Sequence, residues 1–188
     1  HPDFTHQKLN SHQIDFSQPD DRRDEVQGDV LFACLGTTLK AAGSKEAQWA
    51  IDYEANLEFA KAARQNGVNA LVLISASGVN SASRLFYQRM KGELEQAIIA
   101  LNFPHLIIFR PPLLIRPNSD RLGEKIAERI FRVLNRIGML KSQRPLAVEK
   151  LAQSMLKAVL LSYHEQASYS KDHMQVYEPQ DIFRLLDQ

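Results

Sequence analysis

Two uninterrupted apolar runs constrain the fold of this chain more than any other feature of its sequence. They cover residues 30–35 and 70–74, and small polar residues follow each of them directly. A strand that is buried on both faces of a sheet is apolar at every position, which is typical of parallel sheets. The segment between the runs, residues 45–66, is rich in Ala, Glu, Leu and Lys, with Ser44 as a candidate N-cap and Gly67 as a candidate C-terminal cap. The sequence therefore predicts a strand–helix–strand unit with a right-handed crossover.

The alternation of helix and strand continues along the rest of the chain. Further helices are predicted over 84–101, 120–137, 147–163 and 179–186, and further strands over 105–109 and 174–177. Before the first apolar run, the sequence predicts a weak strand over 13–16 and a short helix over 20–26. This alternation is typical of the α/β class with a parallel sheet, and 188 residues correspond to about one domain.

Composition excludes several classes of protein. The 23 basic and 22 acidic residues are nearly balanced, whereas a dedicated nucleic-acid binder normally carries a basic excess. The single cysteine, Cys34, excludes a disulfide framework and a cysteine-based zinc site, and its place in an apolar run predicts a buried strand residue. No metal is expected, because His1, His6 and His12 lack a suitable spacing with carboxylates. The apolar runs are far shorter than the ~18 residues of a membrane span. The expected compartment is a reducing cytoplasm.

Three loops follow predicted strands, and each consists of small, polar or kinking residues. They cover residues 36–38, 75–78 and 110–112. In an open α/β sheet, ligands bind beyond the carboxyl ends of the strands. Each loop alone is more often an ordinary turn, but three in succession on one rim favour a binding site.

Tyr87 and Lys91 lie four residues apart on a predicted helix, so their side chains share a face. An ammonium about 5 Å from a phenol stabilises the phenolate by ~3 kcal/mol at an effective dielectric constant of about 20. We therefore expect Lys91 to lower the pKa of Tyr87 by about two units, toward the range useful for proton transfer. The competing interpretation is that Tyr87 packs in the core and Lys91 is solvated.

Several segments together resemble a known family. They are CLGTT at 34–38, the helical segment at 42–68, LISASGV at 73–79, SRLFYQRMKGELE at 83–95 and FRPPLL at 109–114. The chain resembles the atypical short-chain dehydrogenase/reductases, and more narrowly the bacterial relatives of the human Tat-interacting metastasis suppressor. The resemblance implies one NAD(P)-binding Rossmann-like domain over 1–188, a doubly wound parallel sheet, with 113–188 on the substrate side. It also implies NADP or NAD as the cofactor.

The same resemblance assigns roles to individual residues. Tyr87 would be the proton donor or acceptor, and Lys91 would hold the nicotinamide ribose and lower the pKa of the tyrosine. Ser75, with Ser77 as the second candidate, would position the substrate. The adenosine half of the cofactor would be lined by Leu35, Gly36 and Thr37, and the nicotinamide side by Arg110 and Pro111.

The sequence departs from the family pattern at three places. A glycine-rich pyrophosphate loop is absent, Asp52 stands where many relatives carry Asn on the middle helix, and Pro112 replaces a common Gly. In the strand order 3-2-1-4-5-6 the first strand is central. The first strand–helix–strand unit is therefore expected to be missing, and the 188 residues to be the C-terminal portion of a longer protein. Expressed alone, the chain is expected to bind NADPH weakly or not at all and to expose an apolar sheet edge at 30–35.

Two functions are compatible with these residues. The first is an NAD(P)H-dependent oxidoreductase acting on a carbonyl or alcohol. The alternative is a non-catalytic NADPH-binding regulatory or protein-interaction module on the same fold. The partners considered are a small-molecule substrate and a second copy of the chain in a homodimer, with neither nucleic acid nor membrane. The substrate and the choice between NAD and NADP stay open.

Overall fold

A four-stranded parallel sheet forms the centre of the molecule. The computed structural model describes residues 6–12, 14, 24–115, 144–165 and 174–187. The sheet has the order β1-β2-β3-β6. Its strands are β1 (Val30–Ala33), β2 (Ala70–Ile74), β3 (His105–Phe109) and β6 (Met174–Tyr177). The parallel register pairs Val30 with Ala70, Ala70 with His105, and Leu106 with Met174. The expected α/β fold with a parallel sheet is therefore confirmed.

β1 is two residues shorter than the apolar run that predicted it. The chain leaves the sheet after Ala33, because the Leu35 carbonyl accepts a hydrogen bond from the Asn56 side chain instead of pairing with β2. Cys34 is consequently exposed beyond the end of the strand, and the prediction that it is a buried strand residue is wrong.

Six α-helices and one π-helical segment accompany the strands in the described part of the chain. The short α1 (Leu39–Ala42) precedes one continuous helical stretch, formed by α2 (Lys45–Trp49), the π-helical η2 (Ala50–Ala55) and α3 (Asn56–Gln65). Ser44 caps α2 as expected, with its hydroxyl accepting from the Ala47 amide at 3.1 Å, and Gly67 has a φ of 81° beyond α3. The remaining helices are α4 (Phe86–Ile99), α6 (Val148–Glu165) and α7 (Pro179–Asp187). The short parallel pair β4 (Leu114–Ile115) and β5 (Leu146–Ala147) lies apart from the main sheet.

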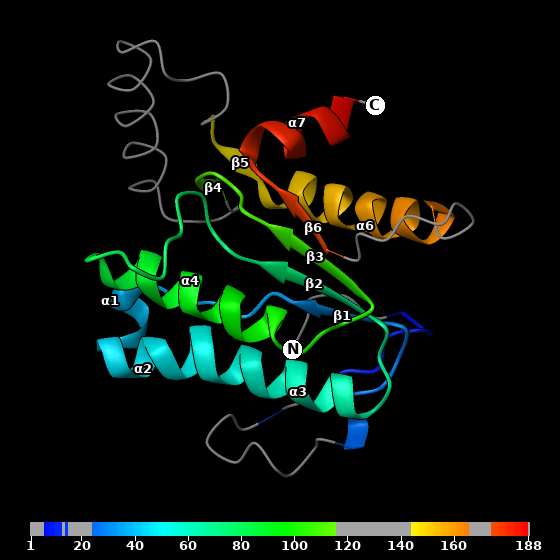
Figure 1. Cartoon of the computed structure of the whole chain (residues 1–188), viewed down its shortest axis with the longest axis horizontal. Helices are drawn as coiled ribbons and strands as arrows, with labels where there is room; N and C mark the ends of the chain where they lie inside the picture. The colour runs from blue at the N-terminus through cyan, green and yellow to red at the C-terminus, as the bar shows by residue number, and fades with distance from the viewer. Residues whose placement is uncertain (1–5, 13, 15–23, 116–143, 166–173, 188) are drawn as a thin grey trace.

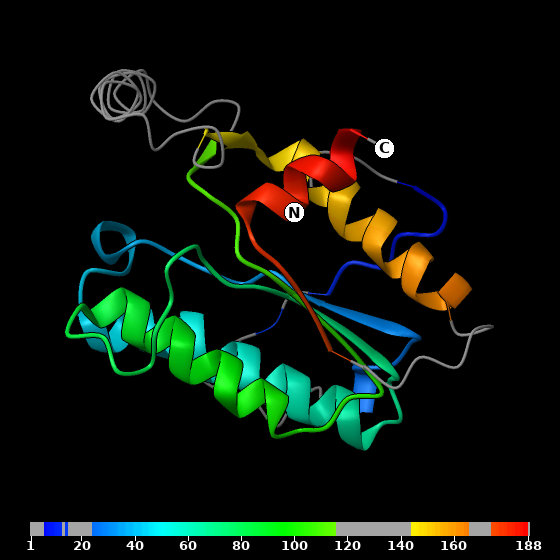
Figure 2. The same ribbon diagram turned by 45° about the horizontal axis from the view of Figure 1, so that its top comes forward.

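The helices form layers on both faces of the sheet. Figures 1 and 2 show α3 and α4 on one face, and α6 and α7 on the other. One core cluster joins Leu71, Leu73 and Ile108 of the strands to Leu94 of α4, and a second joins Phe109 to helices α6 and α7. Strands β2 and β3 are buried on both faces, which explains their unbroken apolar sequence.

β1 is an edge of this sheet, and within the described residues no strand pairs with its outer side. The Phe32 side chain is 41% exposed there, as expected for an apolar edge. The predicted helix over 120–137, residues 20–23 of the predicted helix over 20–26, and nearly all of the predicted strand over 13–16 lie outside the described residues. Among the described helices, none is both long and apolar enough to cross a membrane.

Candidate functional site

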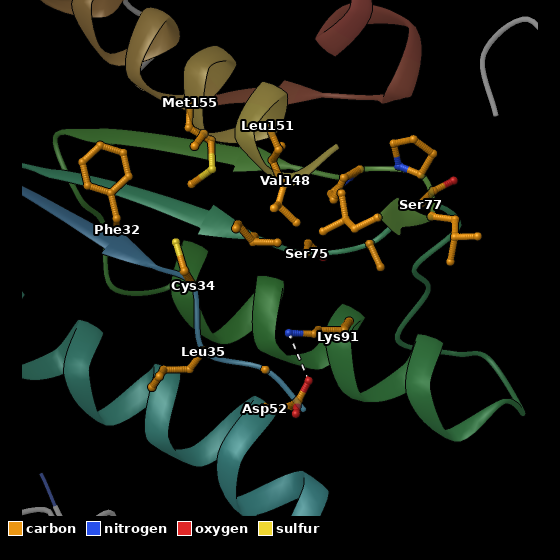
Figure 3. A pocket seen from close by; sticks show the side chains of 18 of the residues that line it. Phe32, Cys34, Leu35, Asp52, Ser75, Ser77, Lys91, Val148, Leu151 and Met155 are labelled. Atoms are coloured by element: carbon orange, nitrogen blue, oxygen red, sulfur yellow. Dashed lines mark ion pairs between the residues drawn. The ribbon is translucent and has the colours of Figure 1, made fainter. Parts of the chain in front are cut away.

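A cavity of about 1120 Å³ opens at the carboxyl ends of β1, β2 and β3. Its walls come from the loops after these three strands, from α4 and from α6, as Figure 3 shows. The described structure brings the following sequence-predicted residues together in this cavity: Leu35, Gly36, Thr37, Ser75, Ser77, Tyr87, Lys91 and Pro111. The apolar wall opposite them is formed by α6 with Val148, Leu151 and Met155.

The serine loop is held at this rim by the neighbouring strand. The Ser75 amide donates to the Phe109 carbonyl at 2.8 Å, and the Ser77 amide donates to the Pro111 carbonyl at 3.1 Å. Ser75 is only 4% exposed, and its buried hydroxyl has no hydrogen-bond partner among the described residues. A buried hydroxyl without a partner costs free energy, and Ser75 is one of the residues that line the cavity.

Tyr87 and Lys91 lie one turn apart on α4, and both line the cavity. Tyr87 is 42% exposed, whereas Lys91 is 3% exposed. The Lys91 ammonium forms an ion pair with Asp52 of η2, with 3.5 Å between Nζ and Oδ1, and the two side chains point toward each other in Figure 3. The alternative in which Lys91 is solvated is therefore excluded.

The expected lowering of the tyrosine pKa is wrong. Partial desolvation of the phenol, together with the negative charge of Asp52, raises the pKa of Tyr87 above its usual value. Burial also lowers the pKa of Lys91, although Asp52 and Glu95 act in the opposite direction. The ammonium is paired with a carboxylate, so its field at the phenol is largely offset. Tyr87 consequently stays protonated at neutral pH, which suits a proton donor.

Three buried polar side chains on one helix hold the loop after β1. Gln48 donates to the Thr37 carbonyl at 3.2 Å, Asp52 accepts from the Thr37 amide at 2.7 Å, and Asn56 donates to the Leu35 carbonyl at 3.1 Å. They are 3%, 1% and 1% exposed. In an α-helix of 3.6 residues per turn, side chains four residues apart do not lie directly above one another. The π-helical η2 has more residues per turn, so it keeps these three side chains closer to one line that faces the loop. The contacts of these three side chains with the loop were not predicted from the sequence. The four-residue spacing of Gln, Asp and Asn in an Ala-rich helix does indicate a polar row on one face of that helix.

Arg110 lies outside the cavity, contrary to its predicted place on the nicotinamide side. Its guanidinium donates to Glu95 through Nε at 3.0 Å, and to Glu178 through Nη1 at 2.7 Å. These carboxylates raise the pKa of Arg110. The physical reason is that β3 ends beside β6, where Glu178 follows the strand, so the guanidinium turns toward two carboxylates instead of the ligand rim.

No metal site accompanies these groups in the part of the chain that the structure describes. There, no group of three or more His, Cys, Asp or Glu side chains is placed to hold a metal ion.

Comparison with known proteins gives curated relatives that match between about half and 72% of the chain. No family model matches. "Protein FMP52, mitochondrial" from Saccharomyces cerevisiae is 45% identical over 101 residues, which are 53% of this chain and 44% of that protein. The protein of the same name from Candida glabrata is 50% identical over 90 residues, which are 48% of this chain and 39% of that protein. The chain spans about half the length of the curated relatives it matches.

The cytoplasmic location expected from the sequence is contradicted by these relatives. Several proteins that match the chain, from different fungi, carry the word mitochondrial in their names. Cysteine content and the lengths of apolar runs carry no information that separates the two compartments.

Solved structures with the same architecture cover most of the chain. UDP-galactose 4-epimerase superposes with a TM-score of 0.55 at 18% identity, over 86% of this chain and 58% of that chain. A dTDP-4-dehydrorhamnose reductase from Yersinia enterocolitica gives 0.58 at 14% identity, over 88% and 62%. RMD from Pseudomonas aeruginosa, complexed with NADPH, gives 0.57 at 20% identity, over 88% and 65%. Together with the strand order, these similarities show that the chain has a Rossmann-like fold.

Proposed function

We propose that this chain carries the proton-transfer site of an NAD(P)H-dependent oxidoreductase that acts on a carbonyl or alcohol substrate. The observation that carries the proposal is that Ser75, whose buried hydroxyl has no hydrogen-bond partner among the described residues, lines the same cavity as Tyr87 and Lys91. A protonated phenol and a serine hydroxyl beside one cavity can both donate to a carbonyl oxygen. A fold shared with RMD from Pseudomonas aeruginosa, which is complexed with NADPH, supports the choice of a nicotinamide cofactor.

The residues of the cavity fit such a cofactor at two places. Gly36 lines the cavity and carries no side chain, so a ligand can approach the backbone closely there. The loop formed by Leu35, Gly36 and Thr37 would therefore lie against the adenosine half, and Lys91 and Pro111 against the nicotinamide half. When bound, the nicotinamide supplies the hydride.

The residues of this chain would then supply the proton. Ser75 would orient the carbonyl oxygen by donating its hydroxyl hydrogen, and Tyr87 would transfer the phenolic proton to that oxygen. The raised pKa of Tyr87 keeps this proton in place before reaction. The apolar residues Val148, Leu151 and Met155 of α6 would form the substrate side, as proposed for the region 113–188.

Location and partners are also proposals. The names of the fungal relatives support a mitochondrial protein. Three statements stay predictions. The chain is similar to bacterial relatives of the Tat-interacting metastasis suppressor, it forms a homodimer, and it binds neither nucleic acid nor membrane. Sedimentation of the purified chain tests the homodimer directly.

The test titrates NADPH and NADH into the chain and follows their oxidation with a panel of aldehydes and ketones. Tyr87→Phe is expected to abolish turnover and leave cofactor affinity nearly intact, because the ring still walls the cavity without a transferable proton. Lys91→Ala is expected to weaken both. Weak binding is expected for a chain without a glycine-rich loop, so the titration is also followed by NMR at high cofactor concentration.

The matched control is Tyr163→Phe on α6, whose hydroxyl donates to the Asp29 carbonyl outside the cavity. It is expected to leave both turnover and affinity unchanged. Turnover that survives Tyr87→Phe would instead favour the non-catalytic NADPH-binding module. NMR signals of the cavity residues that do not move with either cofactor would refute nicotinamide binding.

A further inference from the structure

Lys91 is a buried cation that needs a counter-charge. Its side chain is 4% exposed, and an ammonium at such a position is costly unless it is paired. The ionisable groups that act on it are Asp52 from η2 and Glu95 from its own helix, with Tyr87 one turn before it. Glu95 is engaged by the Arg110 guanidinium through two hydrogen bonds. Asp52 is therefore the carboxylate that balances Lys91.

The Asp52 carboxylate is fixed from a second direction. Its Oδ2 accepts from the Thr37 amide at 2.7 Å, while Oδ1 faces Lys91 at 3.5 Å. Gln48 and Asn56 hold the carbonyls on either side of that amide. One carboxylate thus joins the loop after β1 to the lysine of α4.

We propose that Asp52 is a positioning residue that acts through Lys91. Its carboxylate keeps the ammonium charged at the cavity wall and ties it to the Leu35–Thr37 loop, so that both ends of the cofactor site are held by one group. The catalytic meaning of this role rests on the oxidoreductase function proposed above, whereas the ion pair is a property of the free chain.

The signs of the expected changes follow from the charges. In Asp52→Asn, Lys91 loses the attraction that raised its pKa and keeps the burial that lowers it, so its pKa falls. Tyr87 loses the negative charge that helped to raise its pKa, so its pKa falls as well. As the pH rises, the state with a charged Lys91 and a protonated Tyr87 is therefore lost at a lower pH in Asp52→Asn than in the wild type.

The experiment measures both pKa values in the free chain. Carbon NMR of the lysine side chains follows Lys91, identified by its absence in Lys91→Met. Ultraviolet absorbance of tyrosinate follows Tyr87, after subtraction of the Tyr87→Phe titration. Asp52→Asn is the test variant, because its one amide oxygen can still accept from the Thr37 amide. The negative charge and the oxygen that faces Lys91 are lost. Should this variant fail to fold, Asp52→Ser offers a hydroxyl to the same amide and repeats the measurement.

The matched control is Glu93→Gln, which removes a half-exposed carboxylate from the same helix as Lys91. Glu93 pairs with Arg89 at 3.8 Å on the surface. We expect Asp52→Asn to lower the pKa of Lys91 and Glu93→Gln to leave it unchanged. A Lys91 pKa that is equal in Asp52→Asn and the wild type overturns the proposal.

A cofactor titration separates this inference from the proposed function. We expect NADPH to bind Asp52→Asn about tenfold more weakly than the wild type, since the lost contact is a charge-assisted one. Equal NADPH affinity together with a lowered Lys91 pKa overturns the positioning role. If NADPH binds neither protein, the oxidoreductase proposal fails, and the Lys91 pKa alone decides whether Asp52 holds the ammonium.

Discussion

Replacing Gly92 by alanine tests how closely the loop after β2 approaches α4. Gly92 follows Lys91 and is buried in the middle of the helix, where glycine is otherwise unfavourable. A Cβ at this position would lie 2.7 Å from the Asn80 carbonyl carbon and 3.0 Å from the Ser81 Cα, and closer still to the Ser81 amide nitrogen. Backbone atoms cannot rotate away as a side chain can, so the loop must move as a unit.

The magnitude follows from two opposing effects. Alanine instead of glycine inside a helix gains about 1 kcal/mol. Forcing a methyl group into a filled site costs about 1–3 kcal/mol, and contact with backbone places Gly92 at the upper end. We expect Gly92→Ala to lose about 1–2 kcal/mol of unfolding free energy, which lowers Tm by about 2–8 °C for a domain of this size.

Urea and thermal unfolding measure this loss. Gly36→Ala is the matched control, because it adds the same methyl group where it would meet only the Asp52 side chain, at 3.4 Å. The control is expected to be neutral or to gain about 0.4–1 kcal/mol from the less flexible unfolded chain. Because the displaced loop also carries Ser77, Gly92→Ala is expected to weaken NADPH binding. A Gly92→Ala protein as stable as the wild type would refute the reasoning.

Two further predictions concern charges. Arg110→Met should cost about 2–3 kcal/mol of stability, because Glu95, whose side chain is 6% exposed, loses its partner. The NADPH affinity of this variant should equal that of the wild type. The control is Arg184→Met, which removes an exposed pair with Asp181 and should cost under about 1 kcal/mol. Lys91→Met alone should cost about 3 kcal/mol by leaving Asp52 buried and unpaired, whereas Lys91→Met with Asp52→Asn should lie within about 1 kcal/mol of the wild type. Urea unfolding checks both, and equal losses for the single and the double variant would contradict the second prediction.

The sheet could be predicted because a strand that is buried on both faces has an unbroken apolar sequence, which is visible locally. The unbroken apolar run at 70–74 became β2, with four of its five residues buried. Ligands bind beyond the carboxyl ends of the strands in such a sheet, and this principle predicted the loops that line the cavity. It succeeds because the geometry of a parallel sheet alone brings the ends of neighbouring strands together. Helical spacing placed Tyr87 and Lys91 on one wall of that cavity.

The electrostatics of the site depended on contacts between distant segments, which periodicity does not encode. Spacing on one helix suggested that Lys91 lowers the pKa of Tyr87. Desolvation of the phenol raises this pKa instead, and so does the charge of Asp52, which the packing of η2 against α4 brings to the ammonium. In the same way, the pairing of β3 with β6 places Glu178 beside Arg110 and removes this residue from the cavity. Local sequence determines which residues are buried and where strands end. The charges that meet there are decided by tertiary structure, because ion pairing falls off over a few ångströms and joins residues far apart in the chain.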